Sequence, residues 1–437
     1  MVTTVTPQIV NEVVNVQYAP EPSQLQQSGA LVSAGGSTLG AGKYQYCGSL
    51  SALQAILAAP LPITSLTWAS GVVTATVAAM TLAVGQTFTV TIAGAVPAAY
   101  NGTFVATVAT STTFTYDLTT DPGTETSPGT YTPPYSAFLN GAATTFFAQG
   151  NVVGLYVLEL GPETDASTAI TALGTWITDN PGLFYAYMTA ESWDSEAASL
   201  STLAGDYSSN TGQTYFVATT TSSTISNYGP NKSLYCFVPS PTAPVGEYGA
   251  AADFYNIVVN NPGATNKLKN MAYRFVYGVT GWPKTGYTTE INTVLTAYGN
   301  IHMSLTQAGI TEVGIFKGTV MSGIQFSSWY GIDWYEINAQ LNVTNAVVNG
   351  SNQQPPILYD QNGINSLEIV AQDTANSGIS FGCLQAAACS ATDFYTYTAA
   401  NPSNYQDGIY NGLLCQGTAQ VGFLTIGFTI NVNFSPS

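Results

Sequence analysis

The chain has 437 residues, enough for several domains, and only 7% of them are charged, whereas an average soluble domain has about 25%. Its 24 acidic and seven basic side chains give a formal net charge of −17. Nucleic-acid binding is therefore disfavoured, because nothing resembles a Lys/Arg patch that could neutralise phosphates. A surface with so little charge protects a monomer poorly against association, so the composition favours a self-assembling structural subunit and leaves a basic protein partner open.

The opening residues, the apolar segments and the cysteines bear on the cellular compartment in which the protein folds. The opening residues MVTTVTPQIVNEV lack the basic and apolar regions of a signal peptide, so we expect none. The apolar stretch 61–84 contains Pro62 and many Thr, Ser and Gly residues, so we expect no membrane insertion. The cysteines are odd in number and show no paired framework, so we expect reduced thiols in a cytoplasm rather than disulfides. The five are Cys47, Cys236, Cys383, Cys389 and Cys415.

Residues 1–22 are predicted to form an extended N-terminal arm. The run VTTVTPQIVNEVVNVQYAP is rich in Val and Thr and ends at Pro20, which is typical of a strand. Two interpretations stay open: the arm closes the protein's own sheet, or it is donated as a strand to a neighbouring copy. The candidate strand residues are Val10, Val13, Val14, Val16 and Tyr18.

A small β-sandwich is predicted at residues 63–134, after a turn-rich stretch and a short helix near 49–58. No Asp, Glu, Lys or Arg occurs between residues 44 and 116. Alternating segments such as QTFTVTIAG and GTFVATVAT are separated by Gly, Pro and Asn turns, which indicates short antiparallel strands. The sandwich ends in the linker DPGTETSPGTYTPPY and is expected to be inserted into something larger and to project outward.

From residue 151 the pattern changes to alternating strands and helices. NVVGLYVLEL predicts a buried strand and DASTAITALGTWITDN an amphipathic helix, and similar segments follow up to residue 261. This spacing predicts an α/β layer with a partly parallel sheet. Four further elements are a helix at 288–299, a hairpin at 301–321, a long helix at 327–349 and a helix at 362–375.

The chain ends in a regular strand pattern, FLTIGFTINVNF, at residues 423–434. Its period of two is what a half-buried strand requires. The same two interpretations apply as for the N-terminal arm. The apolar side consists of Leu424, Ile426, Phe428, Ile430, Val432 and Phe434.

Two segments resemble catalytic motifs but do not meet all of their requirements. The segment GGSTLGAGK resembles a phosphate loop, but Ser37 occupies a required Gly position and Tyr44 replaces the required Ser or Thr, so we expect a flexible turn. GISFG around Ser380 matches a nucleophile elbow, but the only histidine, His302, precedes it in the chain. We expect His302 to be structural.

Metal and cofactor sites are also not predicted. Because the chain has a single histidine, most histidine-based metal sites are excluded. Cys383 and Cys389 lack the CxxC spacing of zinc ligands, so we expect them to be packed thiols. Carboxylate chemistry stays open as a minor alternative, because two acids can converge from anywhere in the chain. We therefore expect no enzyme, no catalytic residue and no cofactor.

Several segments resemble contractile phage tail sheath proteins, in the sheath-like family of phages and prophages. They are SSWYGIDWYEINAQLNVTNAVVNG, the following ILYDQNGINSLEIVAQDTANSGI, TGWPKTGY at 280–287 and VNVQYAPEPSQLQQSGALVS. In that family a Trp- or Arg-led helix with an internal Asp, here Trp329 and Asp333, precedes a short break and another helix. The resemblance covers most of the chain outside 63–134.

The resemblance implies a multidomain α+β or α/β fold. Its mixed α/β sheath core would be built from both chain ends, 23–62 and 136–418, with the inserted sandwich as an outer decoration. Arms at 1–22 and 419–437 would add strands to the sheets of neighbours. The implied function is a virion subunit, assembled in the bacterial host cytoplasm, that forms stacked hexameric rings and contracts to drive a tail tube through the host envelope. The implied partners are the tube, baseplate and tail terminator proteins.

One structural alternative is another virion or surface protein, namely a tube, fibre or surface-layer subunit. A tube protein should be shorter and mostly β, and a surface-layer protein should have an export signal. An enzyme with an α/β core and carboxylate chemistry is the third hypothesis. The composition and the terminal strand patterns favour a self-assembling subunit with strand arms, and the resemblance favours the sheath among such proteins.

Overall fold

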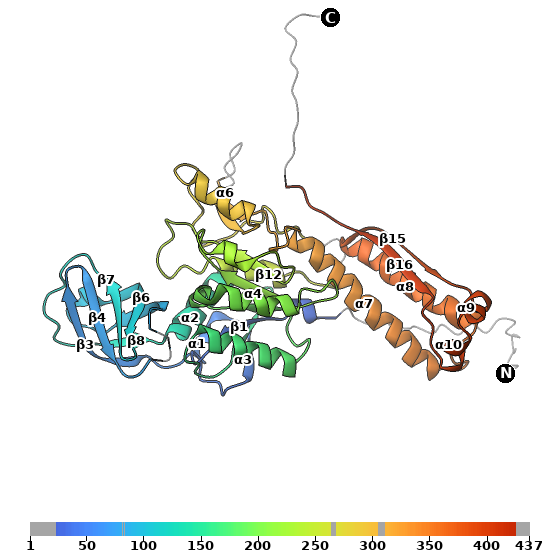
Figure 1. Cartoon of the computed structure of the whole chain (residues 1–437), viewed down its shortest axis with the longest axis horizontal. Helices are drawn as coiled ribbons and strands as arrows, with labels where there is room; N and C mark the ends of the chain where they lie inside the picture. Colours follow the sequence, from blue (N-terminus) through green and yellow to red (C-terminus); the bar gives the residue numbers. More distant parts are fainter. Residues whose placement is uncertain (1–22, 81, 83, 264–267, 305–310, 425–437) are drawn as a thin grey trace, which may run out of the picture.

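The computed structural model describes residues 23–80, 82, 84–263, 268–304 and 311–424. Three bodies lie along the long axis of the molecule (Figure 1): a β-barrel at one end, an α/β core in the middle, and two long helices with a β-hairpin at the other end. None of the helices in these ranges is long and apolar enough to cross a membrane.

The core is a six-stranded sheet in the order β12-β11-β10-β1-β9-β2. Five strands are parallel and β2 is an antiparallel edge strand, so the partly parallel sheet is confirmed. The strands are β1 (Gly29–Ser33), β2 (Lys43–Cys47), β9 (Leu155–Glu159), β10 (Ala186–Met188), β11 (Tyr215–Thr219) and β12 (Leu234–Phe237). β1 is fully buried at the centre of the sheet, although its residues fall in the stretch that was predicted as turn-rich.

Helices cover both faces of this sheet. The core helices are α1 (Leu50–Gln54), α2 (Pro134–Ala148), α3 (Ala166–Asp179), α4 (Ala197–Asp206) and α5 (Ala250–Val258). On one face α2 and α5 pack together, and α5 lies so close to β1 that a Cβ on Gly29 would sit 2.6 Å from Phe254 Cζ. On the other face the ring of Trp176 from α3 contacts Tyr187 of β10. The predicted helix at residues 165–180 is thus present as α3.

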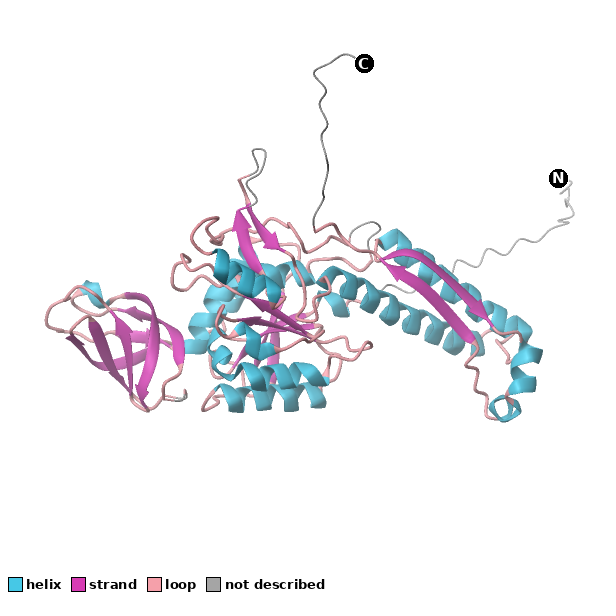
Figure 2. Ribbon diagram, turned by 45° about the horizontal axis from the view of Figure 1, so that its top comes forward, coloured by secondary structure: helices cyan, strands magenta, loops and turns pink. Residues whose placement is uncertain are grey.

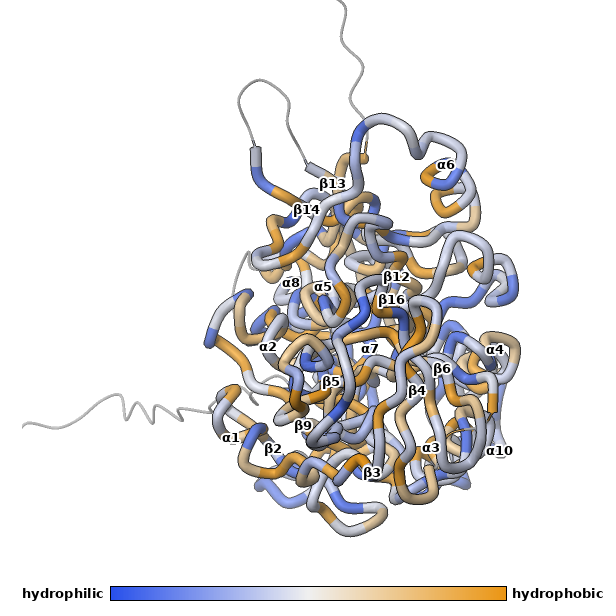
Figure 3. The backbone as a smooth tube through the Cα atoms, turned by 90° about the vertical axis from the view of Figure 1, so that its left-hand side faces the viewer, coloured by the Kyte–Doolittle hydropathy of each residue, from blue (hydrophilic) through white to orange (hydrophobic). Residues whose placement is uncertain are grey.

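The inserted domain is a closed six-stranded barrel, so the prediction of a β-sandwich is wrong. Its order is β3-β4-β7-β6-β5-β8. The strands are β3 (Leu61–Ala69), β4 (Val72–Val77), β5 (Thr87–Ala93), β6 (Gly102–Thr110), β7 (Thr113–Asp117) and β8 (Thr130–Thr132). The three-residue β8 lies in the Pro/Gly-rich segment predicted as a linker, yet it pairs with both β3 and β5 and closes the barrel. Figure 3, viewed from the barrel end, shows hydrophobic and paler segments alternating along the barrel strands, as inward and outward positions must.

The predicted hairpin and long helices are present. The hairpin is β13 (Ile301–Ser304) with β14 (Val313–Phe316), next to α6 (Thr288–Thr296). The far end of the molecule, here called the helix–hairpin module, begins with α7 (Phe326–Ser351) and α8 (Gln361–Phe381). It continues with β15 (Leu384–Ala391), α9 (Phe394–Ala400), α10 (Pro402–Gln406) and β16 (Leu413–Ala419), four elements that were not predicted.

One expectation about the cysteines is wrong. Cys389 of β15 lies directly opposite Cys415 of β16 and the two form a disulfide, so neither is the reduced, packed thiol expected. Antiparallel pairing brings the two side chains together, and sequence spacing alone does not reveal such pairing. Cys47, Cys236 and Cys383 are free and buried, as expected for packed thiols.

Candidate assembly site

The first described residues lie against α7. The backbone N–H of Ser23 donates to Asn338 Oδ1 at 3.3 Å, and Gln26 Nε2 donates to the carbonyl of Tyr330 at 2.9 Å. Gln26 is buried, so this contact holds the start of the described chain beside the first half of α7.

The last described residues lie at the start of the same helix. The Gln325 side chain makes two hydrogen bonds with Gly422: its Oε1 accepts from the backbone N–H at 3.0 Å, and its Nε2 donates to the carbonyl at 2.8 Å. Ser328 Oγ donates to the carbonyl of Gln420 at 3.1 Å, and the Tyr273 hydroxyl donates to the carbonyl of Leu424. The first and the last described residues thus both lie against the first half of α7 or its N-terminal end.

A small open sheet lies beside these contacts. Figure 2 shows the β15–β16 hairpin lying along the long helices. Within the described residues each strand pairs only with the other, so no third strand covers either outer edge. On the β15 side the backbone N–H of Cys389 donates to Gln372 Oε1 of α8 at 2.9 Å. Unpaired strand edges are templates for another chain, and Leu414, 55% exposed, adds apolar surface.

A buried ionic cluster holds the first half of α7 on the core. Asp333 is fully buried, and its Oδ2 accepts from the hydroxyls of Tyr185 and Tyr215 at 2.8 and 2.7 Å. Its Oδ1 lies 3.4 Å from Lys232 Nζ. Burial raises the pKa of Asp333 to about 6, although Lys232 lowers it. Tyr185 directly precedes β10 and Tyr215 is the first residue of the neighbouring β11, so Asp333 joins α7 directly to the sheet.

Lys232 connects both helix residues that the resemblance singled out. Its Nζ lies 4.4 Å from the ring centroid of Trp329, a cation–π contact. It also donates to the carbonyls of Ser209, Asn210 and Gly212 at 3.2, 3.0 and 2.6 Å. The role of Lys232 was not predicted from the sequence, because no local pattern links this residue to a helix about a hundred residues further on.

The loop that resembles a phosphate loop already holds an anion from its own chain. The buried carboxylate of Glu159 accepts from the backbone N–H groups of Gly35, Ser37 and Gly161 at 2.6, 3.0 and 2.9 Å. It also accepts from the hydroxyls of Ser33 and Ser37 at 2.8 and 2.7 Å. The donors that would bind a phosphate are occupied, in agreement with the rejection of this motif.

The other two candidate residues occupy structural settings. Ser380 is an exposed residue inside α8, not at the strand-to-helix turn that a nucleophile elbow requires. His302 is buried on β13, and its Nε2 lies 2.8 Å from Asp253 Oδ1. The Tyr235 hydroxyl donates to Asp253 Oδ2 at 2.9 Å. This buried group joins β12, α5 and β13.

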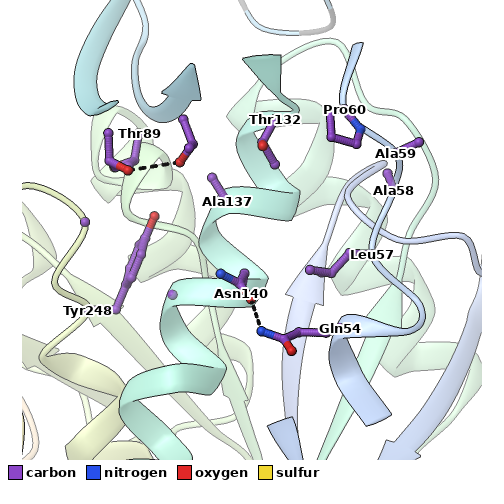
Figure 4. Close-up of a pocket in the computed structure, with 14 residues that line it drawn as sticks. Gln54, Leu57, Ala58, Ala59, Pro60, Thr89, Thr132, Ala137, Asn140 and Tyr248 are labelled. Atoms are coloured by element: carbon purple, nitrogen blue, oxygen red, sulfur yellow. Dashed lines mark hydrogen bonds between the residues drawn. The ribbon is translucent and has the colours of Figure 1, made fainter. Parts of the chain in front are cut away.

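A groove of about 480 Å³ separates the barrel from the core. Figure 4 shows Gln54 of α1 hydrogen-bonded to Asn140 of α2, at 3.0 Å, on the core side of the groove, with Tyr248 at one wall. Its described lining consists of Thr, Tyr, amide and apolar residues, with no carboxylate, amine, thiol or imidazole. The groove therefore offers no group for acid–base or nucleophilic chemistry other than hydroxyls.

Carboxylates line a second groove of about 570 Å³ at the carboxyl ends of β10 and β11, where open α/β sheets commonly bind ligands. Glu191, Asp194 and Glu196 contribute to it. Burial, together with Asp194, raises the pKa of Glu191 to about 7. The described lining contains no His, Cys or Lys. In the described ranges as a whole, no group of three or more His, Cys, Asp and Glu side chains could hold a metal ion.

Most residues predicted to form the arm strands lie outside the described residues. Only Leu424 is inside them, as the last residue. The others are Val10, Val13, Val14, Val16, Tyr18, Ile426, Phe428, Ile430, Val432 and Phe434. Their strand assignment stays a prediction.

No protein-family model and no curated protein matches the sequence. Among solved structures, the chain is similar to one in the cryo-EM structure of the anti-feeding prophage baseplate, with 11% identity over 98% of this chain and 100% of that chain and a TM-score of 0.55. It is similar to the anti-feeding prophage helical sheath in the contracted state, with 12% identity over 99% and 100% and a TM-score of 0.54. The sheath tail protein Lin1278 from Listeria innocua matches with 12% identity over 86% and 90% and a TM-score of 0.43.

Identities this low show the fold alone. The chain has the mixed α/β fold of contractile tail sheath proteins, as the resemblance predicted.

Proposed function

We propose that this chain is the structural subunit of a contractile tail sheath that polymerises by exchanging strands between copies. The observation that carries the proposal is that the first and last described residues meet at α7, beside a two-stranded sheet that no third strand covers within the described residues. The fold that the chain shares with a contracted helical sheath supports the same function.

In this proposal the two arms add strands to the β15–β16 sheet of neighbouring copies. Residues 1–22, fully extended, could span about 70 Å, whereas α7 with its 26 residues is about 39 Å long. The arm is thus long enough to pass beyond its own helix–hairpin module. Strand addition would satisfy the open edges with backbone hydrogen bonds and cover their apolar surface.

The rings would contain six subunits, by analogy with the six-fold symmetrised baseplate that contains a similar chain. Contraction would drive the tail tube through the host envelope, without nucleotide hydrolysis, from a metastable extended state to one that buries more surface. At about 25 cal/mol per Å², a few hundred extra Å² per subunit would release several kcal/mol. The subunit would be assembled in the bacterial cytoplasm and would act in the virion tail.

The charge distribution indicates the surface chemistry of the partners. Residues 318–437 contain seven acidic side chains and no Lys, Arg or His, and all of the acidic side chains except the buried Asp333 are at least partly exposed. A tube, baseplate or terminator surface that docks on the helix–hairpin module would therefore be basic. The barrel lies at the opposite end of the molecule (Figure 1) and would form an outer decoration.

Removing the arms tests the proposal. Deletion of residues 1–18 or 425–437 should abolish assembly into hollow striated tubes or stacked rings, seen by negative-stain electron microscopy, because each deletion removes a donated strand. The circular dichroism spectrum of the remaining monomer should stay that of a folded protein. Unchanged assembly of both deletion variants would contradict the proposal.

A matched pair of substitutions separates strand docking from loss of chain length. Phe428→Asp with Ile430→Asp places charges on the apolar side of the C-terminal strand and should prevent assembly. Thr429→Asp with Asn431→Asp places the same charges on the polar side and should leave assembly intact. Equal effects of the two pairs would contradict a half-buried strand.

A further inference from the structure

We propose that Cys389 and Cys415 form a reversible thiol–disulfide site that covalently cross-links the β15–β16 sheet once the subunit leaves a reducing compartment. The formation of this disulfide takes place within a single subunit and does not depend on the proposed function. Its consequence for the polymer rests on the proposed function, in which the same sheet receives the arms of two neighbours.

Thiol chemistry in this chain is confined to the hairpin. Cys47, Cys236 and Cys383 are each 0% exposed. Burial raises the pKa of the Cys47 thiol to about 11 and of the Cys383 thiol to about 12, and it also raises that of Cys236. Because the thiolate is the reactive form, these three are poor nucleophiles. Cys389 and Cys415 are only half-buried, so a small oxidant or reductant can reach them.

The backbone brings the pair together independently of the bond. Seven register pairs join β15 to β16, and Cys389↔Cys415 is the fifth of them, with paired residues on both sides. The N–H of Cys389 is held by Gln372 of α8, and its sulfur lies 3.5 Å from the Tyr335 hydroxyl of α7. The strand pairing and the two helices would therefore keep the thiols adjacent in the reduced state, ready to oxidise again.

The chemistry needs only a small-molecule disulfide as oxidant. One cysteine thiolate attacks it, forming a mixed disulfide and releasing one small thiolate. The second cysteine thiolate then attacks the mixed disulfide and releases the other. Two protein thiols become one disulfide, the oxidant is reduced to two thiols, and the two protons pass to these products. A cytoplasmic thiol pool would drive the reverse reaction.

The bond would change how the hairpin transmits force. In the reduced state β15 and β16 are joined across the hairpin by backbone hydrogen bonds, and along the chain by the segment containing α9 and α10. The disulfide closes that segment into a loop, with a sequence separation of 26. In a polymer with an arm on each outer edge, tension between the arms crosses the hairpin. The cross-link would then prevent the two strands from separating under that load.

Thiol counting and polymer dissociation test the proposal together. Wild-type polymer is held in buffer with oxidised glutathione or with tris(carboxyethyl)phosphine, then denatured and alkylated. Three alkylated cysteines are expected after oxidation and five after reduction. The urea midpoint for polymer dissociation should be higher for the oxidised form. Cys389→Ser with Cys415→Ser should remove the difference between the buffers, and Cys47→Ala, in the core sheet, should keep it.

A second readout does not depend on polymer formation. In the unassembled full-length fraction, amide hydrogen exchange within β15 and β16 should be about tenfold slower, or more, after oxidation than after reduction. If this difference is found but no polymer forms, the thiol–disulfide site stands and the proposed function fails. Five alkylated cysteines in the oxidising buffer, or equal exchange in both buffers, would overturn the inference.

Discussion

Replacing Gly331 by Ala should loosen the contact between α7 and the start of the hairpin. A Cβ at this position would lie 2.7 Å from Cys383 Cβ and 3.1 Å from both its Cα and its carbonyl oxygen. Two of these three atoms are backbone, so relief requires a shift of the chain where β15 begins. Overpacking of this kind costs about 1–3 kcal/mol. The higher helix propensity of Ala offsets about 1 kcal/mol, which leaves a net destabilisation of about 0–2 kcal/mol.

Gly205→Ala in α4 is the matched control. A Cβ at that position would meet only Asn231 Nδ2, at 4.0 Å, so helix propensity acts alone and should stabilise the protein by up to about 1 kcal/mol. Urea unfolding measures both variants, and amide exchange at β15 shows where Gly331→Ala acts. The reasoning is refuted if Gly331→Ala stabilises the protein as much as the control does, or if exchange at β15 is unchanged.

Three further predictions concern buried groups. The pKa of Asp333 is raised from 3.8 to about 6, so the folded state favours its protonated form. Relative to Asp333→Asn, the free energy of unfolding of the wild type should fall by about 3 kcal/mol as pH rises from below 4 to above 6. The free energy of unfolding of both proteins is measured in urea at each pH. If it changes with pH in the same way for both, the raised pKa of Asp333 is contradicted. Glu159→Gln should cost about 2–4 kcal/mol, because an amide NH₂ then faces donors that need an acceptor, whereas partly exposed Glu163→Gln should cost under about 0.5 kcal/mol. Equal urea midpoints for these two variants would contradict the role of Glu159. Cys389→Ser with Cys415→Ser should lower the unfolding free energy in oxidising buffer by about 3.5 kcal/mol, for a loop with a separation of 26. The same substitutions should change the free energy of unfolding little in reducing buffer. An equal decrease in both buffers would show that the loss of the cysteine side chains, not the loss of the disulfide, causes the destabilisation.

The elements that could be predicted are those with a strong local pattern. The long helix α7, the hairpin β13–β14 and the α/β alternation were all predicted from the periodicity of their apolar residues. The central strand β1 was missed, because GALVS is short, fully buried and surrounded by glycines, so it shows no alternation. β8 was missed because it has three residues in a Pro/Gly-rich segment, and only pairing with β3 and β5 makes it a strand.

The candidate assembly site depended on long-range pairing, which the sequence does not show. β15 and β16 consist mostly of small and polar residues with weak strand propensity, and α8 stabilises them through tertiary contacts. The disulfide and the Lys232–Asp333 pair join residues that are far apart in the chain. The arms themselves were predicted from alternation, and their pairing with a neighbour stays a prediction.

The most direct measurement of the central proposal is a cryo-EM reconstruction of the assembled polymer. The proposal predicts that residues 425–437 of one subunit and an N-terminal segment of another extend the β15–β16 sheet of a third into a four-stranded sheet. Arms that fold back onto the α7 of their own subunit, or polymer contacts that leave both hairpin edges uncovered, would contradict it.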